Sequence, residues 1–177
     1  MEVKVVNKSN NLLPKYETPQ SAGLDVRADF SRVTPQNPIK VFGEGEIIFK
    51  GEGHAITMLR LEPGSRALIP TGLFTAIPEG YEIQVRPRSG LSLKQGLTCA
   101  NCVGTIDADY RNEIGVIIIN LGQDTAWIED GERIAQFVLN KVERIDWNLV
   151  ESLDKTERNG GFGSTNLDEN GKYIASK

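Results

Sequence analysis

The sequence is poor in the side chains that bind metals or carry redox chemistry. Its 177 residues include two cysteines and one histidine. Cys99 and Cys102 have the C-x-x-C spacing of a redox pair or of half a zinc site. A structural zinc site needs four such ligands, and His54 is the only histidine that could join them. No βαβ pattern flanks the pair, so we expect small buried residues on a strand.

Long apolar runs are also missing. The longest, Val116–Ile119, is too short to span a bilayer, and Met1–Ser9 is polar with no signal-peptide core. We therefore expect a cytoplasmic protein with no membrane partner. A net charge of −4 gives no basic footprint for nucleic acid, so no nucleic-acid partner is expected and any related substrate should be small. The composition, with 39% hydrophobic and 25% charged residues, is that of a globular chain with a buried core.

Helical periodicity is rare, and short β-type runs separated by turn pairs dominate the chain. Tyr81–Arg86 alternates apolar and polar residues with period two, which indicates a strand with one solvent-facing side. One short helix is expected at Ser89–Lys94, ending at Gly96. Many short strands predict an all-β fold, either a sandwich, a jelly roll or a small barrel. The other expected strands are Val3–Val6, Glu46–Phe49, Ala55–Leu61, Ala67–Pro70, Leu73–Ile77, Ile114–Asn120, Thr125–Ile128 and Ile134–Val142.

The composition changes near Asp154, after which the chain is polar and rich in glycine. We expect a β domain over residues 1–153 and a flexible arm and tail over residues 154–177. Phe162 stands alone among Gly160, Gly161 and Gly163. Such a segment is either a disordered terminus or an arm that becomes ordered over an anionic aromatic ligand.

Four segments within the β domain could carry chemistry. Pro87–Gly90 (PRSG) combines a guanidinium, a hydroxyl and turn amides, which suit a polyphosphate. Gly104–Val116 (GTIDADYRNEIGV) places Asp107 in a turn, either as a general base or as part of an acidic hairpin tip. On Gly131–Phe137 (GERIAQF), period two predicts Gln136 on the face opposite Arg133, half buried and in need of hydrogen-bond partners. Ala22–Ala28 (AGLDVRA) reads as the start of a strand with a buried Asp25. The sequence has no Walker-type lysine loop.

The order of these segments is more specific than any one of them. AGLD, PRSGLS, GTIDADYRNEI, GERIAQ and RNGGFGST together resemble the five ordered motifs of the trimeric dUTPase family, from about Val3 to Thr165. The resemblance implies a jelly-roll subunit in a homotrimer whose active sites each use all three chains. It also implies hydrolysis of dUTP to dUMP and pyrophosphate, which supplies dUMP for thymidylate synthesis and keeps uracil out of DNA.

The same resemblance assigns roles to individual residues. Asp107 is the expected general base that activates a water for in-line attack on the α-phosphorus, with Gln136 near the α-phosphate or that water. Asp25 is a supporting acid near the waters of a Mg²⁺ ion, which the substrate phosphates hold without a direct protein ligand. The expected substrate-binding residues are Arg88, Ser89 and Gly90 on the phosphates, Asn101, Gly104, Thr105 and Ile106 on uracil, Tyr110 on the deoxyribose, and Arg158, Phe162, Gly163, Ser164 and Thr165 in the mobile arm.

The sequence departs from the family pattern in three places. Around Ser31–Leu59 it has more residues than usual, with the alternation of an added hairpin. The arm is one residue shorter than the common form near Arg158, which weakens the expected Arg158 contact. About a dozen polar residues follow Thr165, and we expect them to be disordered. The alternatives on the same fold are a dCTP deaminase, a bifunctional deaminase–hydrolase and a non-catalytic regulatory trimer.

Overall fold

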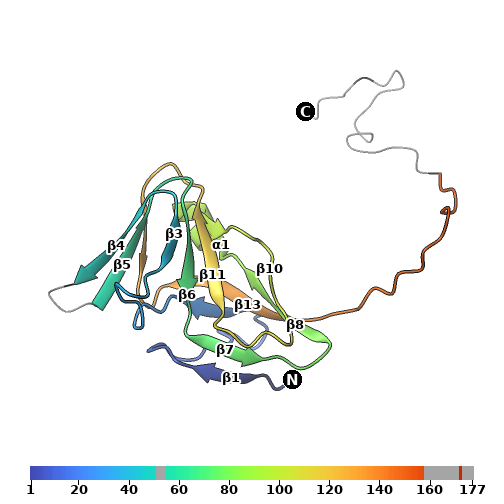
Figure 1. Cartoon of the computed structure of the whole chain (residues 1–177), viewed down its shortest axis with the longest axis horizontal. Coiled ribbons are helices and arrows are strands. Elements are labelled where there is room, and N and C mark those ends of the chain that lie inside the picture. The colour runs from blue at the N-terminus through green and yellow to red at the C-terminus, as the bar shows by residue number, and fades with distance from the viewer. Residues whose placement is uncertain (51–54, 158–171, 173–177) are drawn as a thin grey trace. The chain divides into compact units, whose positions relative to one another are not determined.

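The computed structural model describes residues 1–50, 55–157 and 172. The chain divides into two units, Met1–Glu143 and Arg144–Lys177. The first unit contains every described strand and the single described helix (Figure 1). In the described part of the chain, no helix has the length and apolarity needed to cross a membrane. The division expected after residue 153 stays a prediction.

Two four-stranded sheets carry the fold, and every strand pairing is antiparallel. Two smaller sheets, β12-β5-β4 and β1-β7, complete it. The predicted all-β, jelly-roll-like architecture is therefore confirmed. The first large sheet has the order β10-β8-β13-β2, formed by Gly104–Ile106, Tyr81–Arg86, Arg133–Lys141 and Leu24–Arg27. The second has the order β3-β6-β11-β9, formed by Lys40–Phe42, Arg66–Pro70, Gly115–Asn120 and Leu97–Cys99. The remaining strands are β12 (Ala126–Glu129), β5 (Ala55–Leu61), β4 (Gly45–Lys50), β1 (Lys4–Asn7) and β7 (Leu73–Ala76).

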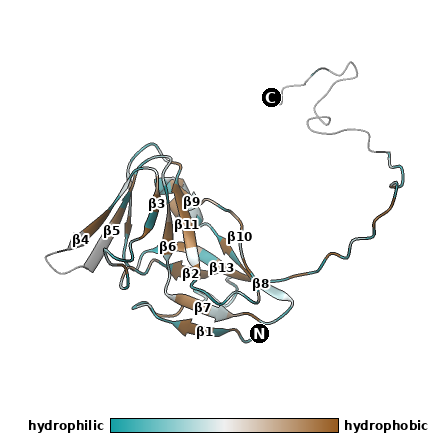
Figure 2. Cartoon of the chain, viewed as in Figure 1, coloured by the Kyte–Doolittle hydropathy of each residue, from teal (hydrophilic) through white to brown (hydrophobic). Residues whose placement is uncertain are grey.

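The core forms because alternate residues of the strands point inward. On β11, Val116, Ile118 and Asn120 are buried, while the residues between them are partly exposed. On β13 of the other large sheet, Ile134 and Phe137 are buried in the same core. Figure 2 shows brown, hydrophobic stretches on β11 and on other strands.

The predicted elements are found within one or two residues of their expected limits. The predicted helix is α1 (Ser89–Gln95), and Gly96 ends it with a left-handed φ of 69°. The expected hairpin is also present, because β4 and β5 pair antiparallel. That these residues are an addition to the family pattern stays a prediction.

Strands β3 and β10 were not predicted, and for β9 only a strand at the cysteines was expected, without its limits. Each has three residues, which is too short for a period-two pattern to be recognised. The prediction for the cysteines was half wrong. Cys99 is buried on β9, but Cys102 is exposed in the turn that follows.

Candidate active site

Asp25 on β2 is the centre of a polar cluster on the first large sheet. Its Oδ1 accepts hydrogen bonds from Arg88 Nε and Gln136 Nε2, both at 3.1 Å. Its Oδ2 accepts one from Arg133 Nη1, also at 3.1 Å. The Asp25 side chain is only 11% exposed, so these contacts replace most of its hydration. We call Asp25, Arg88, Arg133 and Gln136 the Asp25 cluster.

A β-bulge places Arg133 in this cluster. Gln136 lies opposite Asp25, and Arg133 lies opposite Arg27, but only Val26 separates the two pairings on β2. Strand β13 therefore has one residue too many between them, and both Ile134 and Ala135 are buried. The extra residue turns Arg133 to the same face as Gln136. The prediction that they lie on opposite faces was wrong, because strict period two does not hold across a bulge.

Arg88 reaches the cluster from the segment that links β8 to α1. Its backbone is extended, with φ of −93° and ψ of 124°, as the N-cap of α1. Its Nη1 also donates to the backbone oxygen of Arg133 at 3.1 Å, which fixes both ends of the guanidinium. Ser89 and Gly90 are exposed beside it. An added Cβ at Gly90 would meet no atom of the chain within 4 Å, so packing within the chain does not require a glycine there.

The residues expected to bind uracil lie on a turn and a strand at the other edge of the same sheet. Asn101 is in the turn between β9 and β10, and Gly104, Thr105 and Ile106 form β10, which pairs with β8. A Cβ at Gly104 would lie 3.0 Å from Asn101 Nδ2 and 3.3 Å from Val85 Cβ. The glycine therefore allows the Asn101 amide to lie directly against β10.

Asp107 and Tyr110 lie on the turn that follows β10. The Tyr110 amide donates to the Asp107 carbonyl oxygen at 3.2 Å, and the Tyr110 hydroxyl donates to the Glu113 carbonyl oxygen at 3.0 Å. Asp107 is exposed, and the Tyr110 residue is 37% exposed. At the end of the turn, the Ile114 amide donates to the Leu73 carbonyl oxygen at 2.8 Å. We call residues 107–113 the Asp107 turn.

Within a single chain, Asp107 lies far from the Asp25 cluster. Ile106 pairs with Ile83 on one side of β8, whereas Gln136 pairs with Arg86 on its other side. Asp107 and Gln136 are thus about four residues apart along the strands and two strands apart across the sheet. At about 3.3 Å per residue and about 4.8 Å per strand, their backbones are roughly 16 Å apart. The site residues on the described part of the chain therefore form two separate groups.

The expected arm residues and the expected metal ion remain to be considered. Arg158, Phe162, Gly163, Ser164 and Thr165 lie outside the described residues. Among the described residues, no group of three histidine, cysteine, aspartate or glutamate side chains could hold a metal ion.

Burial, with a smaller contribution from Cys102, raises the pKa of the Cys99 thiol to about 11, which makes it a poor nucleophile at neutral pH.

Two groups of residues near the candidate site were not predicted from the sequence. Arg133 enters the cluster through the bulge, for which the sequence GERIAQF gives no signal. Glu113 contacts Arg32, although 81 positions separate them in the sequence. Only close spacing or a shared motif could have predicted the contact from the sequence, and neither links Arg32 to Glu113.

Comparisons with known proteins identify the family to which the chain is similar. The family model of the dUTPase matches residues 54–166, a range that includes the PRSG, IDADY, GERIAQ and glycine-rich segments. The chain is 49% identical over 166 residues to the deoxyuridine 5′-triphosphate nucleotidohydrolase of Finegoldia magna, covering 93% of this chain and 99% of that one. A mutant dUTPase of the 80alpha phage superposes with a TM-score of 0.69 at 26% identity, covering 92% and 98% of the two chains. A mutant dUTPase from phage phi11 of S. aureus, described with a structural Mg(II) ion, has the same fold with a TM-score of 0.65 at 22% identity, covering 88% and 100%. The chain therefore belongs to the dUTPase family.

Proposed function

We propose that this protein hydrolyses dUTP to dUMP and pyrophosphate. The observation that carries the proposal is the Asp25 cluster, in which two arginines are held in place beside the exposed PRSG turn in a chain of the dUTPase family. Fixed guanidiniums and turn amides are the groups that bind a polyphosphate. The product dUMP would serve thymidylate synthesis in the cytoplasm, and removal of dUTP would keep uracil out of DNA.

The proposed general base is Asp107. Its carboxylate takes a proton from a water molecule while the water oxygen attacks the α-phosphorus and pyrophosphate leaves with the electrons of the broken P–O bond. An exposed carboxylate on an anchored turn suits this role, since it is accessible to water and limited in its motion. Gln136 would orient the α-phosphate or the attacking water, and Arg88, Ser89 and Gly90 would hold the phosphates.

Magnesium fits the residues that are present. Asp25 accepts three hydrogen bonds, and a carboxylate has about four lone-pair positions, so one more donor can be accommodated. Mg²⁺ usually keeps several waters and binds through substrate phosphates, so it does not need a group of protein ligands. When bound, it would neutralise charge on the phosphates. Asp25 would then accept a hydrogen bond from one of its waters.

Substrate selection follows from the hairpin and the turn. Asn101 and the backbone of Gly104, Thr105 and Ile106 would read the uracil edge, and Tyr110 would pack on the deoxyribose where a 2′-hydroxyl would otherwise project. Arg158, Phe162, Gly163, Ser164 and Thr165 would close over the base and the phosphates as an arm. A site that hydrogen-bonds one base edge can reject an analogue by about 10⁴-fold.

The proposed assembly is a homotrimer in which one chain supplies the Asp25 cluster, a second the Asp107 turn and a third the arm. The separation of roughly 16 Å between the two groups supports sharing, because no single chain joins them. The segment after β13 supports assembly. Four large apolar or aromatic side chains in it are at least 72% exposed, namely Ile145, Trp147, Leu149 and Leu153. Figure 2 shows brown stretches along this segment.

The first test measures pyrophosphate release from each deoxynucleoside triphosphate in the presence of magnesium. We expect release from dUTP and almost none from the others. Ammonia from dCTP would instead indicate a deaminase, and no reaction with either nucleotide would overturn the proposal.

The second test concerns sharing between chains. An Asp107→Asn chain is refolded together with a chain truncated before Arg158. Each parent should be nearly inactive, and their verified mixed trimers should regain part of the activity. Absence of recovery would argue that each site is built within one subunit.

A further inference from the structure

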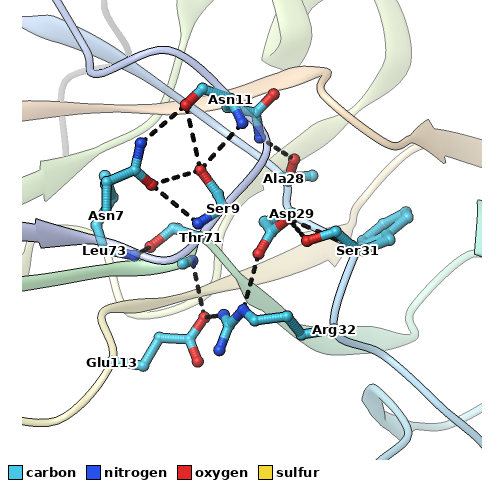
Figure 3. Close-up of polar contacts among 12 residues, drawn as sticks. Asn7, Ser9, Asn11, Ala28, Asp29, Ser31, Arg32, Thr71, Leu73 and Glu113 are labelled. Carbon is cyan, nitrogen blue, oxygen red and sulfur yellow. Dashed lines mark hydrogen bonds and ion pairs between the residues drawn. The ribbon is translucent and has the colours of Figure 1, made fainter.

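Arg32 connects the segment around Ser31–Leu59, which is expected to be an addition to the family pattern and is called the extra segment below, to the Asp107 turn. Its Nε donates to Asp29 Oδ2 at 3.2 Å, and its Nη2 donates to Glu113 Oε1. Asp29 is 1% exposed, and Ser31 Oγ donates to its other oxygen at 2.6 Å. Figure 3 shows the guanidinium lying between the two carboxylates. One end of the bridge is therefore fixed in the core, and its other end holds a residue of the turn.

Glu113 is held on a second side as well. The oxygen that accepts from Arg32 also accepts the Gly72 amide at 2.8 Å. Gly72 has a φ of 71°, and an added Cβ there would lie 2.9 Å from Asp29 Oδ2 and 2.5 Å from Ser9 Cβ. Arg32 thus links Asp29 to Glu113, the Gly72 amide holds the same Glu113 oxygen, and a side chain at position 72 would collide with Ser9 and Asp29. Burial opposes the charge on Arg32, but hydrogen bonds and charge from Glu113 and Asp29 outweigh it and raise the pKa of the guanidinium.

The position of Glu113 determines how the turn is held. The Glu113 carbonyl oxygen accepts the Tyr110 hydroxyl, and the Tyr110 amide in turn binds the Asp107 carbonyl oxygen. The turn itself is largely exposed, so side-chain packing contributes little to its order. Arg111 donates to the carbonyl oxygens of Ala108 and Tyr110, which belong to the same turn, so these bonds do not tie the turn to the sheets.

A cavity beside Tyr110 gives the ring space to move if this hold is lost. It has a volume of about 280 Å³ and is lined by Tyr110, Arg32 and Glu113 together with Val33 and Ile39 of the extra segment. Without the Arg32 bridge, Glu113 loses its cationic partner, and Tyr110 can rotate toward this space. The carboxylate of Asp107 would then lose its alignment.

We propose that Arg32 is a positioning residue for dUTP hydrolysis, which acts through Glu113 to fix the turn carrying Asp107 and Tyr110. The proposal rests on the proposed function. Displacement of a catalytic group by about 1 Å can cost up to about 10²-fold in rate. For Arg32→Ala we expect kcat for dUTP to fall by about tenfold, and the ratio of kcat/KM between dUTP and UTP to narrow, because Tyr110 no longer holds its place against the sugar.

The experiment compares Arg32→Ala with Arg60→Ala, a matched control. Arg60 has a side-chain exposure of 36%, against 34% for Arg32, and it also pairs with two carboxylates, those of Glu46 and Glu62. Neither of its partners belongs to the Asp107 turn. Arg60→Ala should leave kcat for dUTP, and the ratio of kcat/KM between dUTP and UTP, near the wild-type values. Arg32→Lys is the second variant, because lysine keeps the charge but lacks the planar fork that reaches two carboxylates, and it should lose activity as well.

A double-mutant cycle tests the route through Glu113. Glu113→Gln keeps an oxygen for the Gly72 amide but removes the charge that attracts Arg32. If Arg32 acts through Glu113, the double variant should lose no more than the larger single loss. If the loss of kcat in the double variant equals the two single losses combined, the proposal is overturned.

Hydrogen exchange gives a readout that does not depend on turnover. The Gly72 and Tyr110 amides should exchange faster in Arg32→Ala than in wild type. In Arg60→Ala their exchange rates should equal those of wild type. Equal exchange in all three proteins would overturn the positioning role, even with an active enzyme. A wild-type protein that releases no pyrophosphate from dUTP would overturn the proposed function instead, and exchange would still report whether Arg32 holds the turn.

Discussion

Replacing Asp25 with asparagine removes the anion that Arg88, Arg133 and Gln136 share. The asparagine can keep one acceptor oxygen, but its amide group then faces at least one of the arginines. Hydrogen bonds to charged groups contribute about 1.5–3 kcal/mol each, and breaking a fully buried ion pair costs about 3–5 kcal/mol. The Arg133 side chain is 42% exposed and the Arg88 side chain 25%, so water compensates for part of the loss.

We therefore expect Asp25→Asn to lower the free energy of unfolding by about 2–3 kcal/mol. For a unit of this size, that corresponds to a fall in Tm of about 5–10 °C. The assay is thermal unfolding without nucleotide, followed by circular dichroism at one protein concentration, because an oligomer's Tm depends on concentration. No substrate is present, so the result is independent of the proposed reaction.

Asp124→Asn is the control for this measurement. It makes the same change of charge at an exposed carboxylate in the turn between β11 and β12. Its Tm should stay close to that of wild type. If Asp25→Asn were equally harmless, the three contacts at 3.1 Å would not be stabilising, and the reasoning from burial and charge would be refuted.

Three further predictions concern catalysis and pH. Asp107→Asn should bind dUTP normally but lower single-turnover hydrolysis by about 10²–10⁴-fold; wild-type turnover would remove Asp107 from the mechanism. Tyr110→Ala should narrow the ratio of kcat/KM between dUTP and UTP, and an unchanged ratio would place sugar selection elsewhere. The pKa of Cys99 is raised from 9.0 to about 11 in the folded protein, so the unfolded chain loses this proton first as the pH rises. The free energy of unfolding should therefore fall by about 2 kcal/mol between about pH 8 and pH 10.5. In urea unfolding, Cys99→Ala should reduce this fall and Cys102→Ser should retain most of it; a fall of wild-type size in Cys99→Ala would contradict the assignment.

Patterns along the chain predicted the elements that bury one face, such as β8 and β11. They could not predict β3 and β10, because three residues carry no period. The AGLD, PRSG and GERIAQ segments were singled out from the sequence, and the structure brings Arg88 and Gln136 into contact with Asp25. The roles expected for them in function stay predictions. Arg133 was missed because the bulge at Ile134 depends on how β13 pairs with β2, which is a property of two strands together. The same holds for Arg32 and Glu113, which only the folded chain brings into contact.

The two groups of site residues are ordered in different ways, and this has a consequence for how the enzyme would become active. Three residues of the Asp25 cluster lie on the paired strands β2 and β13, Arg88 joins them from the N-cap of α1, and the cluster is complete within a chain. The Asp107 turn is exposed, and it depends on the hydroxyl of Tyr110 and on the contacts of Glu113 to Gly72 and Arg32. Each group therefore has its internal contacts within the single chain. In the proposed shared site, assembly would bring two finished halves together without folding either one, and activity should depend on protein concentration while the secondary structure stays constant.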